Sequence, residues 1–265
     1  MGRGDLPEEQ WQRLQPLLPP HKPQTGRPNS DHRKIINGIL WILRTGAPWR
    51  DLPTEYGNWR TVSSRFYRWR KAGIWDQVLA ALQAAGDKDG GLDWEVHFVD
   101  GDDSSGTSTC GWGKKTTPAA EALGRSRGGF STKVHLRAEG GGKPICLVLT
   151  PGQDAESKQV PALLENGAVK RPGRGRPRKR PRRLVGDKGY CGQPVRTFLR
   201  KRGIRVTIPK RKNMNRQGPF NKEIYRRRNL VERLINRFKQ YRRIAEKLAA
   251  NYRAMWVLAA IIMWL

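Results

Sequence analysis

Three acidic residues, far apart in the sequence, stand where their carboxylates can act together. Asp100 and Asp187 each follow a short β-prone run, and Glu232 lies on a helix predicted over residues 223–243. An acid at the carboxyl end of a buried strand is exposed where sheets of this kind place their ligand sites. Either aspartate alone would be a weak signal, because Asp after a short strand is commonly a turn or cap residue.

The helix predicted over residues 223–243 carries two stripes of side chains. It contains no Gly or Pro and is rich in helix formers. Its apolar residues recur at the spacing that gathers them on one buried face: Leu230, Val231, Leu234, Ile235 and Phe238. At about 100° per residue, a second face carries Tyr225, Arg228, Glu232 and Lys239. A single Glu in such cationic surroundings stays ionised and suits a metal ion beside a phosphate.

Three acids in a chain with a formal net charge of +29 point to phosphodiester chemistry. Two divalent cations a few ångströms apart activate the attacking oxygen and stabilise the leaving one, and Mg²⁺ and Mn²⁺ prefer hard oxygen ligands. We therefore expect Asp100, Asp187 and Glu232 to be catalytic and to hold two such ions, with Asp100 shared between them. The bland alternative is an amphipathic helix with a solvated basic face and an incidental Glu.

Two motifs carry a family resemblance. The spacing Tyr225-x2-Arg228-x3-Glu232-x6-Lys239 resembles the Y-x2-R-x3-E-x6-K signature of insertion-sequence transposases of the DDE class, in the four/five superfamily. The segment Asp187-Lys188-Gly189-Tyr190 is similar to that family's D-[KA]-G-Y motif after the fourth strand. The resemblance implies that this chain acts on DNA as those transposases do.

The same resemblance implies DNA contacts beside the carboxylates. It places Tyr225, Arg228 and Lys239 on the strand next to the scissile phosphate, where an Arg fork and a Lys point charge suit phosphate oxygens. Lys188 belongs to the D-[KA]-G-Y match. Lys133 ends a partial match to the family's R-x-x-G-G-x-x-T-K segment, so we expect Lys133 and His135 to face the site, and both lysines to bind DNA.

One departure from the family concerns the first acid. The family usually continues with a hydroxyl residue and a short Val-Arg-Ala-His-like segment, whereas this chain reads Asp100-Gly-Asp-Asp-Ser-Ser-Gly106. Asp102 and Asp103 can therefore compete as metal ligands. The sequence leaves open which acid of this cluster coordinates.

The composition favours a folded protein that binds nucleic acid. For a chain of 265 residues, a net charge of +29 makes nucleic acid the leading partner and an anionic membrane surface the second. Ten tryptophans and a 37% apolar fraction argue against a disordered basic tail. The three cysteines, Cys110, Cys146 and Cys191, lack the spacing of a zinc site or a disulfide framework. The apolar run over 254–265 is too short to span a bilayer, so we expect a helix packed in the core and no membrane role.

Residues 1–85 are predicted to form a helical DNA-binding domain. A helix from the cap Asp31 to Thr45 and a basic helix over 61–71 are joined by Gly-containing turns, which favours a helix-turn-helix-like reader. Arg65 and Arg68 on the later helix are expected to contact DNA. The alternative is a helical bundle whose basic face touches nothing. The unit also resembles the N-terminal domain of the same transposases in Gly26-Arg27-Pro28, Arg44-Thr45-Gly46 and Trp49-Arg50-Asp51-Leu52-Pro53.

A linker over 86–93 and a catalytic domain over 94–265 are predicted to follow. The expected strands cover residues 94–99, 129–137, 143–150, 183–186 and 204–209, and the expected helices cover 157–166, 193–202 and 223–243. The order strand-strand-strand-helix-strand-helix-strand-helix is that of an RNase H-like fold. We therefore expect an α+β protein: a helical N-terminal domain followed by an RNase H-like α/β catalytic domain.

Residues 170–183 form a basic tract with nine Lys or Arg in fourteen positions. Self-repulsion and three prolines predict an insert that is mobile without a partner. Arg174-Gly175-Arg176-Pro177 looks like an AT-hook core, in which an extended Arg-Gly-Arg enters a narrow A·T minor groove. A loop that binds phosphates without sequence preference is equally favoured. In both interpretations Arg174 and Arg176 contact DNA.

These observations predict the transposase of a bacterial insertion element, which binds terminal inverted repeats and target DNA and cleaves and transfers strands with Mg²⁺ or Mn²⁺. Because two double-strand ends must be joined, we expect a homodimer or larger assembly on double-stranded DNA, in the cytoplasm with the nucleoid. Two alternatives stay open. One is a catalytically silent DNA-binding protein derived from a transposase, which would need no acids, and the other is a metal-dependent nuclease without strand transfer.

Overall fold

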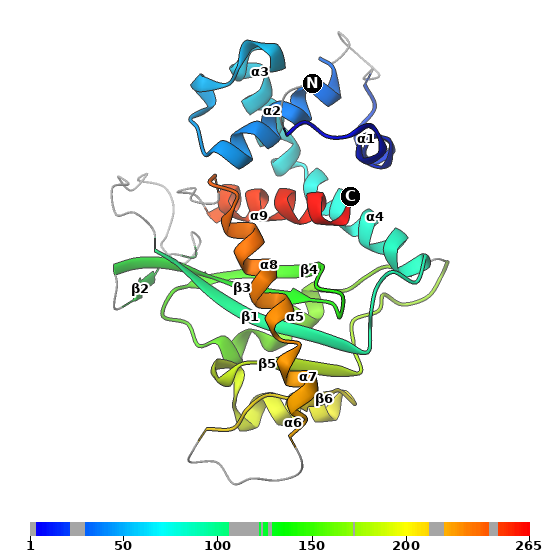
Figure 1. The fold of residues 1–265 in the computed structure, drawn as a ribbon, viewed down its shortest axis with the longest axis vertical. Helices are drawn as coiled ribbons and strands as arrows, with labels where there is room; N and C mark the ends of the chain where they lie inside the picture. Colours follow the sequence, from blue (N-terminus) through cyan, green and yellow to red (C-terminus); the bar gives the residue numbers. More distant parts are fainter. Residues whose placement is uncertain are drawn as a thin grey trace. The chain divides into compact units, whose positions relative to one another are not determined.

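The structure is a computed structural model that describes residues 4–21, 30–105, 122, 124–126, 129–171, 173–211, 220–243 and 249–265. Cys110 and the motif Gly26-Arg27-Pro28 lie outside these residues. The chain divides into two compact units (Figure 1). The first contains residues 1–82, 238–246 and 250–265, and the second contains residues 83–237 and 247–249.

The first unit is helical. Its α-helices are α1 (Glu8–Leu14), α2 (His32–Thr45), α3 (Trp59–Lys71), the first part of α4 (Ile74–Lys88) and α9 (Ala249–Trp264). Its 3₁₀ turns are η1 (Gln15–Leu17), η2 (Trp49–Asp51) and η3 (Thr54–Tyr56). The predicted cap of α2 is confirmed, because the Asp31 carboxylate accepts from the Arg33 N–H at 2.8 Å. The helix ends at Gly46, whose φ of +74° is the left-handed geometry that glycine adopts readily.

The connection between α2 and α3 is longer than the turn of a simple helix-turn-helix. It covers residues 46–58 and includes η2 and η3. Pro48 directly precedes η2, and Pro53 directly precedes η3. Proline has no backbone N–H and a fixed φ, so it suits the position before such a turn. The basic helix α3 is therefore presented after a structured loop.

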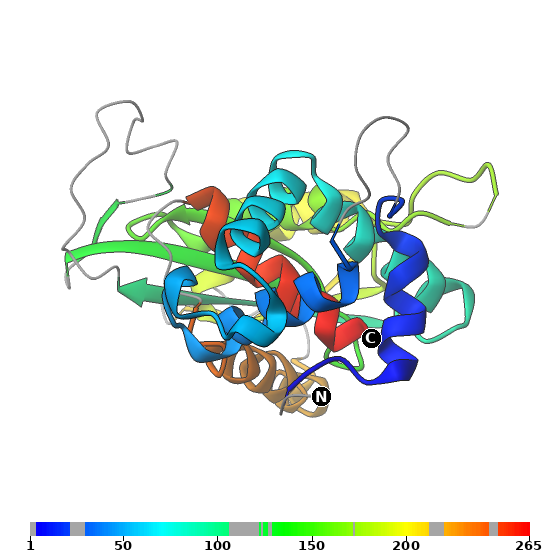
Figure 2. The same cartoon turned by 90° about the horizontal axis from the view of Figure 1, so that it is seen from above.

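Helix α9 groups with the N-terminal helices, although the sequence led us to place it in the second domain. Most of its side chains are buried, as its apolar sequence predicts. The Arg13 guanidinium of α1 donates from Nη2 to the Trp264 carbonyl at 2.9 Å, so the end of α9 lies beside α1 (Figure 2). Helix α4 also extends to Lys88, into the stretch predicted as a linker over 86–93. Among the described residues, no helix combines the length and apolar character needed to cross a membrane.

The second unit is built on a sheet of six described strands. The strands are β1 (Val96–Ser105), β2 (Gly124–Ser126), β3 (Gly129–Ala138), β4 (Pro144–Pro151), β5 (Arg183–Gly186) and β6 (Arg205–Thr207). The helical elements are η4 (Glu156–Gln159), α5 (Val160–Asn166), η5 (Lys188–Tyr190), α6 (Gln193–Lys201), α7 (Lys222–Arg226) and α8 (Asn229–Lys239). Apart from the short β2, the order of strands and helices is the one predicted for an RNase H-like fold.

Strand pairing gives the sheet a mixed character. Strands β1, β3 and β4 form an antiparallel meander, and the predicted hairpin of β3 and β4 around Gly140–Gly142 is confirmed. Strands β5 and β6 continue the sheet from β1 in parallel. Strand β1 is longer than predicted: it runs past Asp100 to Ser105 because β3 pairs with it along that whole stretch. Asp100 therefore lies within the pairing of β1 with β3, but one residue beyond the last pair of β1 with β5.

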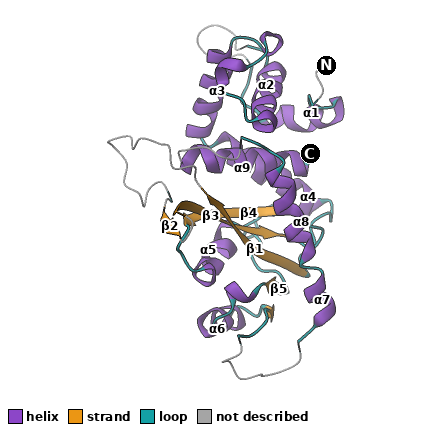
Figure 3. Ribbon diagram, turned by 60° about the vertical axis from the view of Figure 1, so that its left-hand side comes forward, coloured by secondary structure: helices purple, strands orange, loops and turns teal. Residues whose placement is uncertain are grey.

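Helices cover both faces of this sheet (Figure 3). On one face, α5 and α6 bury an apolar cluster with the strands, including Val99, Leu163, Leu184 and Leu199. Helices α7 and α8 lie on the opposite face, where the Arg227 guanidinium stands 6.0 Å from the Phe98 ring. The apolar stripe predicted for α8 is confirmed for Val231, Leu234, Ile235 and Phe238, which are buried, whereas Leu230 is half-buried.

The single helix predicted over 223–243 is wrong, because the chain forms two helices with a break at residues 227–228. There the N–H groups of Arg227 and Arg228 bond three residues back, to Ile224 and Tyr225, as in a tightened turn. The side chains of both arginines are drawn to the sheet: Arg227 donates to the Gly140 carbonyl at 3.1 Å, and Arg228 reaches Asp100. Tyr225 therefore stands on α7, and the 100° argument does not extend to it.

Candidate active site

Strand register brings Asp100 and Asp187 side by side. Strands β1 and β5 are parallel, and their last pair is Val99 with Gly186. Asp100 and Asp187 are the next residue on each chain. Because carboxyl ends of parallel strands meet at one edge, the two carboxylates share that edge, as the sequence predicted.

Asp187 is oriented by the backbone that follows it. Its carboxylate accepts from the N–H groups of Gly189 at 2.9 Å and Tyr190 at 3.3 Å, which makes it the cap of η5. Lys188, which lies between Asp187 and Gly189 in the sequence, is exposed to solvent. The D-[KA]-G-Y motif is thus a strand end followed by a tight capped turn.

Arg228 joins Glu232 to Asp100. Its Nη1 donates to Asp100 Oδ2 at 3.0 Å, and its Nη2 pairs with Glu232 one helical turn further along α8. The Arg228 and Asp100 side chains are 20% and 13% exposed, so their ion pair is partly shielded from solvent. The arrangement brings the third acid to the first.

Burial dominates the electrostatics of Asp100. Burial raises its pKa to about 6, against the lowering effects of Arg228 and the Gly101 N–H, while Asp187 and Glu232 raise it further. The effect of burial on the pKa of Asp100 therefore outweighs that of its ion pair with Arg228.

The donor set fits a divalent cation in chemical type and in charge. Carboxylate oxygens are the ligands that Mg²⁺ and Mn²⁺ prefer, and the Arg228 guanidinium occupies a cationic position between Asp100 and Glu232. In the described part of the chain, no three metal-binding side chains are close enough to hold an ion as they stand. A cation would therefore take over contacts that Arg228 makes.

The residues predicted to bind DNA beside the acids have different surroundings. Lys239 is exposed on α8, two turns beyond Glu232. The Tyr225 ring lies 5.8 Å from the Arg228 guanidinium. Lys133 is 3.4 Å from both Asp103 and Glu156.

On helix α3, the two predicted DNA contacts differ sharply in exposure. Arg65 is 6% exposed, and its guanidinium lies 5.3 Å from the Trp69 ring and 3.3 Å from His32 Nδ1. This burial argues against a direct contact of Arg65 with DNA. Arg68, three residues further along α3, is exposed.

The basic tract has a fixed base, which the charge pattern did not predict. Val169 and Arg178 pair in an antiparallel bridge, with N–H to carbonyl distances of 2.9 and 2.7 Å. The Arg178 guanidinium stacks 4.6 Å from the Trp94 ring, and buried Arg137 donates to the Lys179 carbonyl at 2.8 Å. The segment Arg174–Arg176 is exposed at the far end of the loop.

Glu156, on η4, is a fourth carboxylate of this region that sequence reasoning missed. Burial raises its pKa, and so does the neighbouring Asp187, against the lowering effect of Lys133. No motif or spacing connects it to the other acids, because it approaches them only through the path of the chain from β4 into α5.

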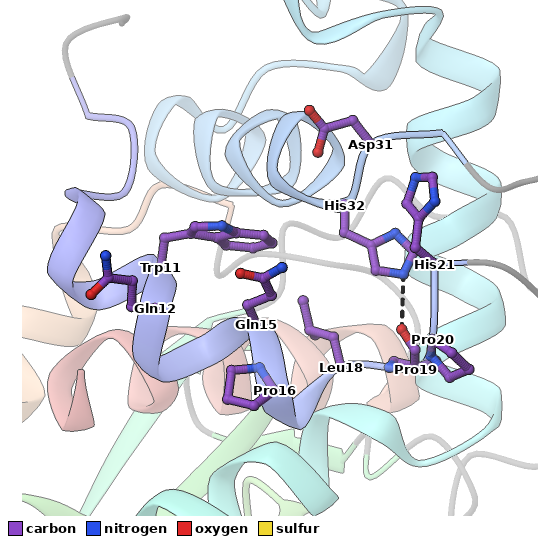
Figure 4. A pocket seen from close by; sticks show the side chains of 10 residues that line it. All are labelled: Trp11, Gln12, Gln15, Pro16, Leu18, Pro19, Pro20, His21, Asp31 and His32. Atoms are coloured by element: carbon purple, nitrogen blue, oxygen red, sulfur yellow. Dashed lines mark hydrogen bonds between the residues drawn. The ribbon is translucent and has the colours of Figure 1, made fainter.

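A separate hollow of about 600 Å³ lies in the first unit, between α1 and the start of α2 (Figure 4). Its lining is mostly Pro, Gln and Trp side chains. The Asp31 carboxylate caps α2, and His32 contacts the Pro19 and Ser30 carbonyls. These groups serve the local fold, so we assign no chemistry to this hollow.

Solved structures with some similarity include the Mos1 transposase paired-end complex with left transposon end, at 11% identity and a TM-score of 0.26, over 86% of this chain and 82% of that chain. The Mos1 mariner paired end complex with Mn gives 12% identity and a TM-score of 0.26, over 97% of this chain and 84% of that chain. TM-scores this low establish no common fold, so the fold assignment rests on the order and pairing of the strands.

Relatives by sequence match part of the chain. The uncharacterized protein y4sN of Sinorhizobium fredii is 35% identical over 89 residues, 34% of this chain and 68% of that protein. The insertion element IS402 uncharacterized 16.2 kDa protein of Burkholderia cepacia is 40% identical over 95 residues, 32% of this chain and 65% of that protein. The putative transposase for insertion sequence element IS402, from the same organism, is 33% identical over 108 residues, 40% of this chain and 49% of that protein.

Two family models together account for most of the sequence. The model described as putative transposase of IS4/5 family matches residues 6–79. The model described as transposase DDE domain matches residues 95–264, which include all three acids of the site. The chain therefore belongs to the transposases with a DDE domain.

Proposed function

We propose that the chain is a transposase that binds the terminal inverted repeats of its insertion element, cleaves them, and joins the released 3′-hydroxyl ends to target DNA. The observation that carries this proposal is the convergence of three carboxylates from distant parts of the sequence. The pairing of Val99 with Gly186 sets Asp100 beside Asp187, and Arg228 links Glu232 to Asp100. Membership in a transposase family supports DNA as the substrate.

Asp100, Asp187 and Glu232 are the residues that would hold Mg²⁺ or Mn²⁺, in a site for two ions. Bound there, the ions would activate the attacking oxygen and stabilise the leaving oxygen of the phosphodiester. Asp187 is kept in place by two backbone N–H groups. Arg228 keeps Asp100 and Glu232 within reach of each other, and its guanidinium would be available to a DNA phosphate if a cation took over its contacts with these acids.

The proposed DNA contacts extend beyond the carboxylates. Tyr225, Arg228, Lys239, Lys188 and Lys133 would contact the strand beside the scissile phosphate. Arg68 would contact DNA from the helical unit, and Arg174 and Arg176 from the basic loop. Arg65 instead supports the packing of α3. Because two DNA ends must be joined, the protein would act as a homodimer or a larger assembly on DNA. Since its substrate would be DNA, it would be found with the nucleoid in the cytoplasm.

The test is incubation of the purified protein with Mg²⁺ and DNA carrying the ends that flank its gene, followed by strand-resolved mapping of the products. We expect nicks at the ends and joined products. Asp187→Asn should slow cleavage about a thousandfold, because several kcal/mol of transition-state charge stabilisation is lost. Glu95→Gln is the matched control, since Glu95 is exposed and pairs with Arg182 before β1 begins.

Each of the other results would point to a different function for this protein. Cleavage by Asp187→Asn at the wild-type rate would contradict the proposed site. Salt-sensitive binding without cleavage, in Mg²⁺ and in Mn²⁺, would identify a silent DNA-binding protein. Nicks at the ends without joined products would identify a nuclease.

A further inference from the structure

Glu156 lies against the backbone that carries the two aspartates. It begins η4, which follows β4 after residues 152–155, and it lies beside Gly101 of β1 and Gly189 of the turn after β5. Its Oε1 lies 3.3 Å from the point where a Cβ on Gly101 would stand. Gly101 follows Asp100, so the Glu156 carboxylate is close to the strand end that positions the first acid.

Gly189 leaves the space that the Glu156 carboxylate occupies. A Cβ on Gly189 would lie 1.8 Å from Glu156 Oε2 and 3.1 Å from Asp187 Oδ1. The carboxylates of Glu156 and Asp187 therefore flank the same backbone residue. A side chain of any size at position 189 would have to displace Glu156.

Lys133 is the cation that Glu156 contacts in this structure. Its Nζ lies 3.4 Å from Glu156 Oε1 and 3.4 Å from Asp103 Oδ1, directly across from Asp103 in the β1–β3 pairing. One lysine is thus shared by two carboxylates, while the Asp187 carboxylate beside them contacts backbone N–H groups.

We propose that Glu156 is a fourth carboxylate of the cation-binding site, facing Asp187 across Gly189, and that Lys133 is its counter-ion until a divalent cation binds. This inference rests on the proposed function. A purely structural Glu156 would hold Lys133 and η4 in place and would leave cation affinity unchanged.

The test measures binding of Mn²⁺ to the full chain without DNA, by electron paramagnetic resonance of the free ion. Glu156→Gln should lower the affinity at least about tenfold. Glu165→Gln is the matched control, because Glu165 is exposed on α5 and pairs with Lys179 away from the site. Its affinity should equal that of the wild type.

Two further variants separate position from charge. Gly189→Ala keeps every carboxylate but displaces that of Glu156 and crowds that of Asp187, so it should lower the affinity at least as far as Glu156→Gln does. Lys133→Met removes the competing cation and should raise the affinity, provided that Glu156 is present. Equal melting temperatures for all variants would show that the fold is kept.

The outcomes distinguish this inference from the proposed function. Wild-type affinity in Glu156→Gln, together with loss of binding in Asp187→Asn, would overturn the role of Glu156 and leave the three-acid site intact. Absence of Mn²⁺ binding by the wild-type protein would overturn both proposals.

Discussion

A single contact at the scale of residues decides between acids that the sequence leaves equivalent. Asp100, Asp102 and Asp103 stand within four positions of one strand. Side chains alternate along a strand, so Asp103 points to the face where Lys133 lies, away from α8. Asp102 shares the face of Asp100 but lies further along β1, beyond the end of β5. Arg228 pairs with Asp100, which singles out Asp100 as the partner of Glu232.

This contact predicts a difference between two conservative substitutions. Asp100→Asn should reduce end cleavage about a thousandfold, because it removes a proposed ligand shared by both ions. Asp102→Asn removes the same charge two residues away and should keep most of the activity. The check is the initial rate of end cleavage in Mg²⁺ for both variants. Equal losses would show that both acids take part.

At the scale of elements, the basic tract is a loop with a fixed base. The bridge between Val169 and Arg178 closes it, and the contacts of Arg178 with Trp94 and of Arg137 with Lys179 attach it to the sheet. Arg137 is fully buried and also donates to His97 Nδ1 at 3.0 Å, so the attachment reaches the core. A loop that is anchored in this way loses less conformational entropy when its exposed end binds.

We expect the exposed end of this loop to prefer a narrow minor groove. Replacing Arg174 and Arg176 together by Ala should weaken binding to an A·T-rich duplex by roughly tenfold more than to a G·C-rich one, because Arg enters narrow grooves of enhanced negative potential. The matched control is the double Ala variant of Arg200 and Lys201, which removes two exposed cations at the end of α6. Fluorescence anisotropy at fixed salt measures both affinities. Equal losses on the two duplexes would identify a phosphate-binding loop without sequence preference.

At the scale of the whole molecule, stability depends on pH through buried histidines. His135 is fully buried, with Nε2 2.9 Å from Thr150 Oγ1 and Nδ1 3.3 Å from the Tyr190 hydroxyl. Burial, and then the charge of Lys133, lowers its pKa from 6.5 to about 4. His97 is buried in the same way, and its pKa is lowered by burial and then by Arg137. Both rings are neutral in the folded protein and gain a proton on unfolding in mild acid.

We therefore expect the free energy of unfolding to fall as the pH drops below about 6.5 and to keep falling toward pH 4. The unfolded chain binds more protons than the folded one in that window, and His135 alone should cost about 2 kcal/mol between pH 7 and pH 5. Asp100 acts with the opposite sign, because its folded pKa is raised to about 6. Comparison of urea unfolding for the wild type and His135→Gln isolates the histidine. The same pH dependence in both proteins would contradict this assignment.

The sequence by itself determined most of the elements, and it predicted the three acids that we propose for the site. Apolar periodicity marked the buried face of α8, and a Gly-rich turn marked the hairpin of β3 and β4. An acid at the end of a short apolar run marked Asp187 as a strand end. These features depend on neighbours a few positions apart, so they can be read from local spacing. Of the predicted stripe of Tyr, Arg, Glu and Lys, the helical spacing is confirmed for Arg228 and Glu232, which lie one turn apart and contact each other.

Tertiary structure alone decided which residues meet. The pairing of Val99 with Gly186 sets Asp100 beside Asp187, and the path from β4 into α5 brings Glu156 to Gly189. The break before α8 forms where Arg227 and Arg228 contact the sheet, although every residue there favours a helix. Arg65, basic and on a helix, is buried by its neighbours. Each of these outcomes depends on contacts between segments distant in the sequence, whose free energies outweigh the local preferences that spacing and composition record.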